Sequence, residues 1–217
     1  MKIIVLDGVD ASGKATQAKL LAEALSNAGF KTKLMSFPNY DSQSSALVKM
    51  YLNGEWGTNI SEINTYAVAS AYALDRYVSM KNTDFGEYDV VVMDRYTTSN
   101  AIHQASKLTG TDKKEFLEWI FKYEYDILGI PKPSKVFFLD VAPEYGKKLM
   151  ANRPLKAGTS KDIHESNDKF LVDSYVNAME IARSQNWEIV NCVNNGEIKN
   201  IQDIATEIFH SVIDFLN

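Results

Sequence analysis

The chain has 217 residues, of which 45% are hydrophobic, and this is enough for one sizeable core. Its net charge of −5 excludes a broad basic face for nucleic acid polymers or anionic membranes, so any anion must be bound locally. The single cysteine, Cys192, excludes an intrachain disulfide and a multi-cysteine metal cluster. The N-terminal apolar run is too short for a signal peptide, and no run approaches the length of a membrane span. We therefore expect a single cytoplasmic domain over residues 1–217.

The chain opens with a short apolar run and a glycine-bracketed loop. Ile3 to Leu6 have the continuous apolar pattern of a strand buried on both faces of a parallel sheet. Gly8, Gly13 and Lys14 then follow the spacing of a phosphate-binding P-loop, in which backbone N–H groups and a helix N-terminus converge on an anion. A chance match in a strand-to-helix loop is the alternative. We predict that a nucleotide's phosphates contact Gly8, Val9, Asp10, Ala11, Ser12, Gly13, Lys14, Ala15 and Thr16.

A helix and a second strand complete a βαβ unit. Apolar residues recur at helical spacing from residue 18 to 28, and residues 31–37 predict a strand. The ligand site of such a unit lies beyond the carboxyl ends of its strands. Phe37 and Pro38 end the second strand at that edge, and residues 44–53 predict a short helix.

Residues 61–80 predict a longer helix that begins at the N-cap Ser61. Tyr72 and Arg76 lie four residues apart on it, so an aromatic plane and a guanidinium project side by side, which suits holding a flat base and reading its polar edge. The spacing allows equally that Tyr72 packs in the core and Arg76 is solvated. The apolar face expected on this helix comprises Ile63, Tyr66, Ala67, Ala71, Leu74 and Val78.

The third predicted strand, residues 88–93, ends in the charged pair Asp94-Arg95. An acid at the end of a central parallel strand beside the P-loop is placed to hold magnesium, usually through water, so Asp94 is the predicted metal residue. The adjacent Arg95 can neutralise a phosphate bidentately. A surface salt bridge between the two neighbours is the alternative, although a buried strand rarely ends in such a pair without a function.

The remaining chain continues to alternate helices and strands. Five strands alternating with helices predict an α/β fold, namely a three-layer P-loop kinase fold with a five-stranded parallel sheet flanked by helices. The further helices are expected over 97–107, 113–128, a segment through Met150, 170–183 and after Asn200, and the further strands over 135–140 and 187–193.

Residues 152–167 interrupt this alternation. The segment is polar, lacks a hydrophobic period and carries the cations Arg153, Lys156 and Lys161. It predicts a mobile lid that brings cations over a bound triphosphate and excludes water, with an ordinary solvated loop as the alternative.

These parts together specify phosphoryl transfer from a nucleotide to an acceptor that itself carries a phosphate and a planar group. A nucleoside monophosphate kinase fits that description. It needs no protein nucleophile, because the acceptor phosphate attacks directly while Lys14, magnesium and lid cations stabilise the charge. A deoxynucleoside kinase is one alternative, against which Arg95 argues, and a nucleotide-switch or binding module is a second.

Several segments taken together resemble the thymidylate kinase family over nearly the whole chain. They are GVDASGKATQ, the Phe37-Pro38 pair, YALDR ending in Arg76, DRYTTSN beginning at Asp94, and DIHE at residues 162–165. The resemblance implies that ATP, with Mg2+, phosphorylates dTMP to dTDP, that dUMP is a poorer acceptor, and that the protein is a homodimer.

The resemblance also implies roles for single residues. Asp10 would contact the acceptor's 3′-hydroxyl, Arg95 would grip its phosphate, and Tyr72 would stack on thymine. The family places a catalytic arginine either in the P-loop after the aspartate or on the lid, and since Ala11 fills the first position, Arg153 is the first candidate. The implied catalytic residues are Lys14, Asp10, Arg95 and Arg153, and the implied substrate-binding residues are Asp10, Phe37, Pro38, Tyr40, Tyr72, Arg76, Arg95, Ser99, Asn100, His103, His164 and Glu165.

Three positions depart from the family pattern. Ala15 lacks the hydroxyl that normally reaches magnesium, so the ion would rely on phosphates, waters and Asp94, or Thr16 would compensate by contacting phosphate. Tyr40 stands where many members have an arginine for the acceptor phosphate. His103 stands where a tyrosine or phenylalanine often lines the sugar pocket.

Overall fold

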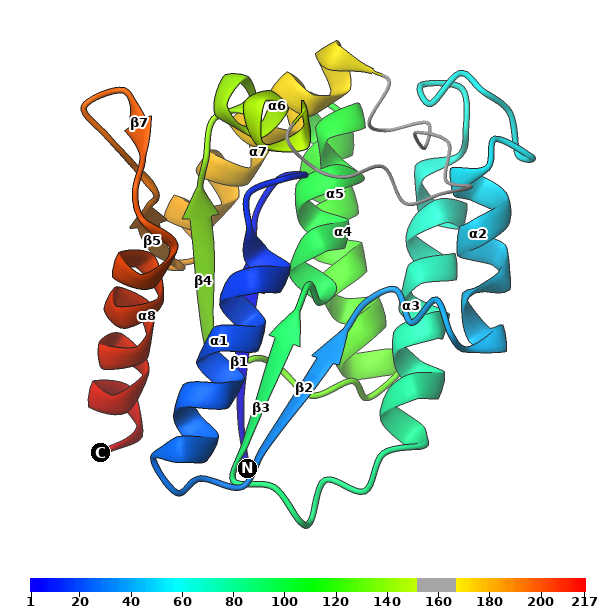
Figure 1. Ribbon diagram of the computed structural model, residues 1–217. Coiled ribbons are helices and arrows are strands. Elements are labelled where there is room, and N and C mark those ends of the chain that lie inside the picture. Colours follow the sequence, from blue (N-terminus) through cyan, green and yellow to red (C-terminus); the bar gives the residue numbers. More distant parts are fainter. Residues whose placement is uncertain (152–166) are drawn as a thin grey trace.

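The computed structural model describes residues 1–151 and 167–217, so the lid predicted over 152–167 lies outside the described residues, apart from Asn167. The centre of the fold is a five-stranded parallel sheet in the order β2-β3-β1-β4-β5 (Figure 1). The predicted sheet is therefore confirmed. Its strands are β1 (Lys2–Asp7), β2 (Thr32–Ser36), β3 (Val90–Asp94), β4 (Lys135–Asp140) and β5 (Glu188–Asn191).

Strand β1 lies in the middle of the sheet, which explains its uninterrupted apolar run. Ile4 is in register with Val92 on β3 and with Lys135 on β4. One sheet face packs against α1 (Lys14–Asn27) and α8 (Ile201–Leu216), which lie on the same side of the sheet in Figure 1. The other face carries a separate apolar cluster around Phe37 and Tyr96. The result is the expected three-layer arrangement.

The other helices follow the predicted order with shifted ends. Asn64 rather than Ser61 caps α3, because its Oδ1 accepts a hydrogen bond from the Ala67 N–H at 3.0 Å. The predicted helix 44–53 is a 3₁₀ turn (Gln43–Ser45) followed by α2, and the helix 97–107 is α4 followed by a 3₁₀ turn (Ala105–Lys107). The helices are α2 (Ala46–Leu52), α3 (Thr65–Lys81), α4 (Thr97–His103), α5 (Gly110–Phe121), α6 (Pro143–Ala151) and α7 (Asp168–Ser184).

The apolar face predicted for α3 is wrong for most of its length. Tyr66, Leu74 and Val78 are 38%, 41% and 37% exposed, whereas Asp75 and Arg76 are buried. The inward side of this helix borders the polar pocket as well as the apolar clusters that contain Ala69 and Met80, so charged and apolar residues share it.

Helix α5 changes type at its end. Residues Lys122–Ile127 form a π-helical segment, within the region predicted as one helix over 113–128. The wider turn places Glu124 where it is fully buried. A π-helical turn shifts the register of the side chains, and a search for the 3.6-residue period does not reveal it.

A short β-hairpin follows β5 and was not predicted. It pairs β6 (Val193–Asn194) with β7 (Glu197–Ile198). Its turn residues, Asn195 and Gly196, have φ of 51° and 81°, and Asn-Gly between two strands is a strong sequence signal for such a turn.

Candidate active site

The carboxyl ends of β1, β2 and β3 bring the predicted functional segments to one edge of the sheet. The Arg95 N–H donates to the Leu6 carbonyl at 3.1 Å, and the Phe37 N–H donates to the Asp94 carbonyl at 3.0 Å. These bonds continue the parallel ladders past the strand ends. The P-loop, the Asp94-Arg95 pair and the Phe37-Pro38 turn are therefore fixed relative to one another.

The P-loop runs from the end of β1 to the start of α1. Gly13 has a φ of 85°, in the left-handed region that glycine adopts without strain. At Gly8 a Cβ atom would stand 2.5 Å from Ser12 Oγ and 3.1 Å from the Leu139 carbonyl oxygen, so a side chain there would collide with the loop. Ala15 and Thr16 lie exposed at the first turn of α1.

Lys14 is buried at the base of the P-loop, where its Nζ donates to the Val9 carbonyl at 3.0 Å. Burial and the neighbouring Arg95 lower the pKa of Lys14, while Asp10 and Asp94 oppose the shift, and the net result is a pKa of about 8. The ammonium group of Lys14 is therefore poorly solvated and only partly neutralised by its neighbours. Such a group binds a polyanion favourably.

Asp7, the last residue of β1, was not predicted as part of the site. It is fully buried and accepts hydrogen bonds from the Gly8 N–H at 2.9 Å, from Thr98 Oγ1 at 2.5 Å and from Ser99 Oγ at 2.8 Å. It therefore ties the start of the P-loop to the first turn of α4. An acid that ends a buried strand was the signal used for Asp94, and the same signal was present here.

Arg95 joins the P-loop to α4. Its backbone has a φ of 66°, and its guanidinium forms an ion pair with Asp10 and a 3.0 Å hydrogen bond with His103 Nε2. Because an arginine only donates, His103 Nε2 is the acceptor in this bond. Burial alone would lower the pKa of Arg95, but the nearby carboxylates of Asp10, Asp7 and Asp94 raise it above its ordinary value.

Asp94 is the carboxylate with unused acceptor capacity at this edge. Its Oδ1 is buried without a hydrogen-bond partner among the described residues, and its Oδ2 accepts only a long 3.4 Å bond from Ser36 Oγ. Burial raises the pKa of Asp94, against the opposing effects of Lys14 and Arg95. An orphaned carboxylate oxygen of this kind fits a cation. In residues 1–151 and 167–217, no group of three or more His, Cys, Asp or Glu side chains could hold a metal by itself.

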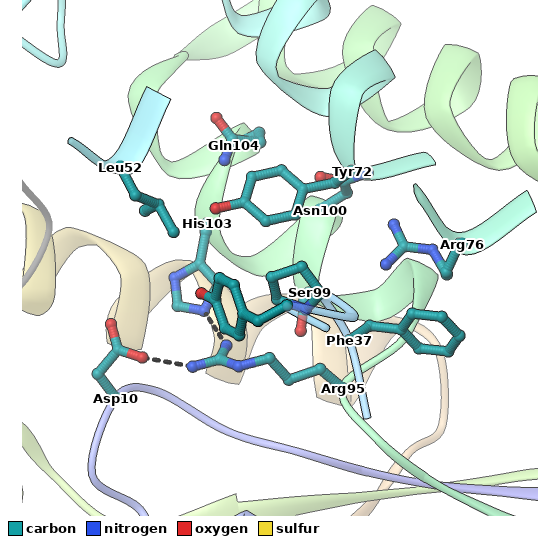
Figure 2. A pocket seen from close by; sticks show the side chains of 12 residues that line it. Asp10, Phe37, Leu52, Tyr72, Arg76, Arg95, Ser99, Asn100, His103 and Gln104 are labelled. Atoms are coloured by element: carbon teal, nitrogen blue, oxygen red, sulfur yellow. Dashed lines mark hydrogen bonds and ion pairs between the residues drawn. The ribbon is translucent and has the colours of Figure 1, made fainter. Parts of the chain in front are cut away.

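A pocket opens between the P-loop, α3 and α4, and Figure 2 shows Asp10 at one end of it and Arg76 at the other. It gathers every predicted substrate-binding residue that lies within the described part of the chain. Leu52 and Gln104 also line it and were missed, since nothing in their local sequence marks them. The predicted residues around the pocket are Asp10, Phe37, Pro38, Tyr40, Tyr72, Arg76, Arg95, Ser99, Asn100 and His103.

The far end of the pocket is built around a buried ion pair. Arg76 Nε and Nη2 donate to the two carboxylate oxygens of Glu124 at 2.7 and 2.9 Å. The Arg76 guanidinium also lies 5.7 Å from the Phe37 ring centre and 6.0 Å from that of Tyr96. Arg76 is thus buried rather than solvated, and Tyr72 lines the pocket rather than the core.

Asn100 connects with the same acid. Its Nδ2 donates to Glu124 Oε1 at 2.8 Å and to the Ala69 carbonyl at 3.1 Å. Glu124 was not predicted, because it lies inside a stretch whose aromatic residues suggested packing alone. Arg153, His164 and Glu165 lie outside the described residues.

The phosphate-binding loop lies at the carboxyl edge of a parallel sheet with the order β2-β3-β1-β4-β5, and a pocket opens beside it. This arrangement is that of a P-loop phosphotransferase. The family model for thymidylate kinase matches residues 6–204. The chain therefore belongs to the thymidylate kinase family, and it is an enzyme of the kinase class.

Individual relatives agree with this assignment. The chain is 30% identical over 189 residues to the thymidylate kinase of Mycobacterium tuberculosis, an alignment that covers 85% of this chain and 87% of the relative. It is 30% identical over 141 residues to human thymidylate kinase, covering 64% and 60% of the two chains. The solved structure of Candida albicans thymidylate kinase shares the fold, with a TM-score of 0.71, 20% identity, and 98% and 91% coverage.

Within residues 1–151 and 167–217, no helix is long and apolar enough to cross a bilayer.

Proposed function

We propose that the chain transfers the γ-phosphoryl group of ATP to the 5′-phosphate of dTMP, giving dTDP and ADP. The observation that carries this proposal is the Arg95–Asp10 ion pair, which stands where the P-loop meets the pocket. A cation at that junction can bind the phosphate of an acceptor. A protein that binds only one nucleotide has no acceptor phosphate for this cation.

The shape of the pocket orients the acceptor. Figure 2 shows Arg95 extended toward Asp10 at the P-loop end, and Arg76 beside Phe37 at the opposite end. In the proposed complex the phosphate lies at the Arg95 end and the base lies between Tyr72 and the Arg76 end. The acceptor phosphate then faces the triphosphate held by the P-loop, so a direct in-line attack needs no protein nucleophile.

The protein contributes charge stabilisation rather than covalent chemistry. Lys14 and the P-loop N–H groups meet the charge that develops on the transferred phosphoryl group, and each such donor is worth on the order of 3 kcal/mol of barrier. Because Ala11 leaves the P-loop without an arginine, we assign the additional catalytic cation to Arg153, with Lys156 and Lys161 as weaker candidates in the proposed lid. Glu165 and His164 are proposed as substrate-binding residues of the same segment.

Magnesium is proposed to bind beside Asp94, whose buried Oδ1 has spare acceptor capacity. Asp7 is a poorer ligand, because Gly8, Thr98 and Ser99 already donate to its oxygens. When bound, the ion would supply positive charge that offsets the negative charge of the ATP phosphates. Ala15 has no hydroxyl to offer, so the remaining ligands are phosphate oxygens and waters.

The acceptor phosphate has fewer cations than the family pattern provides. Tyr40 lines the pocket in place of an arginine and offers at most a neutral hydroxyl donor. Arg95 therefore carries most of the charge recognition of the acceptor, with His103 fixing the guanidinium from the other side.

An ADP-release assay with dTMP, dUMP, dCMP and thymidine tests the proposed reaction. We expect dTMP to be the best acceptor and dUMP a poorer one. Turnover of thymidine without turnover of dTMP would establish the deoxynucleoside kinase alternative. ATP hydrolysis that is independent of every acceptor and coupled to partner binding would establish the nucleotide-switch alternative.

The proposed enzyme is a cytoplasmic homodimer. Leu74 and Val78 on α3, together with Leu47 and Met50 on α2, are between 37% and 45% exposed, and α2 packs against α3. Exposed apolar side chains on two adjacent helices favour an interface with a second copy. Gel filtration with light scattering is expected to give twice the 24.4 kDa of one chain, and Leu74→Glu with Val78→Glu is expected to give the monomer. A wild-type protein of one-chain mass would refute the dimer.

A further inference from the structure

Glu124 is a buried acid that lies just outside the pocket, yet it touches two of the side chains at its far end. It has no exposed surface, and the π-helical segment after α5 directs it inward. Its Oε1 accepts from both Arg76 and Asn100, and its Oε2 accepts from Arg76. No role for it follows from phosphate binding or transfer. Its contacts lie where the base is proposed to bind.

These contacts determine which way the Asn100 carboxamide faces. A carboxylate only accepts hydrogen bonds, and so does the Ala69 carbonyl, so both must be met by the amide nitrogen. The two Nδ2 hydrogens are used in this way at 2.8 and 3.1 Å. The amide oxygen is then the atom that Asn100 has left to present to the pocket that it lines.

The same acid determines what Arg76 presents. Its Nε and Nη2 donate to Glu124, so Nη1 is the nitrogen left for the pocket. The guanidinium also lies over the rings of Phe37 and Tyr96, 5.7 and 6.0 Å from their centres, and these contacts limit its freedom to turn. The Arg76–Glu124 pair as a whole carries no net charge, which suits the recognition of a neutral base.

We propose that Glu124 is a specificity-determining positioning residue: it makes the pocket show one donor, from Arg76, beside one acceptor, from Asn100. This inference rests on the proposed function. A 4-oxo pyrimidine offers the matching pair, with O4 as acceptor and N3–H as donor. A 4-amino pyrimidine offers the reverse pair, so donor meets donor and acceptor meets acceptor.

Glu124→Gln tests the proposal while it conserves shape. The glutamine amide can donate to the Asn100 oxygen, so the Asn100 carboxamide is free to turn its Nδ2 toward the pocket. The matched acceptors are dTMP and 5-methyl-dCMP, which share the methyl group and differ at N3 and the 4-substituent. We expect the ratio of kcat/KM for 5-methyl-dCMP to that for dTMP to rise about tenfold or more, with the KM for ATP unchanged.

Two further variants distinguish a role of Glu124 in orienting Asn100 from a general role in stabilising the pocket. Glu124→Asp keeps an acceptor-only carboxylate, so it should hold the acceptor ratio closer to wild type than Glu124→Gln does. Asp75→Asn changes another fully buried acid next to the pocket, one that binds the Asn39 N–H and Ser44 Oγ rather than Asn100. It should alter the KM for dTMP without changing the ratio. Equal losses for both acceptors in Glu124→Gln would overturn the proposal.

The wild-type protein offers a measurement that does not depend on the folding of any variant. In ¹H–¹⁵N spectra the Asn100 side-chain amide protons should be protected from exchange with solvent before and after dTMP binds. Fast exchange of these protons in the free protein would overturn the proposal. Failure of the wild type to turn over dTMP at all would instead refute the proposed function, so the two failures are distinguishable.

Discussion

The lowered pKa of the buried P-loop lysine predicts that nucleotide binding takes up a proton. With a pKa of about 8 in the free protein, Lys14 is ~90% protonated at pH 7, half protonated at pH 8 and ~10% protonated at pH 9. A bound triphosphate brings negative charge to Nζ and restores full protonation. Binding at pH 8 should therefore take up about half a proton, and affinity should fall about tenfold between pH 7 and pH 9 as the charged form is lost.

Isothermal titration calorimetry of ATP with saturating Mg2+ in two buffers of different ionisation enthalpy measures this uptake directly. The matched control is Lys14→Arg, whose guanidinium stays charged throughout this range, so the slope with pH should vanish even if the affinity is lower. Proton uptake below about 0.1 at pH 8, or the same pH slope in Lys14→Arg as in the wild type, would refute the reasoning.

Four further outcomes are expected. Arg95→Ala should raise the KM for dTMP about 10- to 150-fold, the worth of one hydrogen bond to a charged group, and leave the KM for ATP nearly unchanged; an equal rise in both would mean that Arg95 is misassigned. Arg153→Ala should lower kcat about 100-fold with little effect on either KM, and an unaltered kcat would move the catalytic role to Lys156 or Lys161. Ala15→Ser should lower the Mg2+ concentration at half-maximal rate, and no change in magnesium titrations would show that a hydroxyl there does not reach the ion. Burial raises the pKa of Cys192 to about 12, so a maleimide should label it only after denaturation; rapid labelling of the native protein contradicts the burial.

The sequence predicted those parts of the fold and site whose functional residues are close together in the chain. The P-loop has its glycines and lysine at a fixed spacing, and the Asp94-Arg95 pair stands immediately after an apolar strand. The central strands β1, β3 and β4 were found because buried parallel strands are continuous apolar runs, whereas the edge strands β2 and β5 are only partly buried. The residues of the base pocket came from the family resemblance, since their spacing alone left Tyr72 and Arg76 undecided.

The residues that sequence missed act through contacts distant in the chain. Glu124 meets Arg76 and Asn100 only because a π-helical turn redirects it, and no periodic pattern records that turn. On α3 the predicted apolar face points outward for most of its length, because the buried Asp75 and Arg76 lie on the inward side. Hydrophobic periodicity shows which side of a helix is apolar, and it fails to identify the inward side where that side carries buried charged residues.

Two residues at the junction between the P-loop and the pocket keep backbone angles that other residues avoid. Ala11 and Arg95 have φ of 61° and 66°, and an L-residue in this region costs about 1–2 kcal/mol. This cost lowers the free energy of unfolding, and it accompanies the backbone geometry that joins the P-loop to the acceptor pocket. Heat resistance and catalytic geometry therefore compete at these positions. A laboratory selection that rewards survival at high temperature alone would favour glycine at residues 11 and 95, and at residue 95 it would discard the arginine on which acceptor recognition depends.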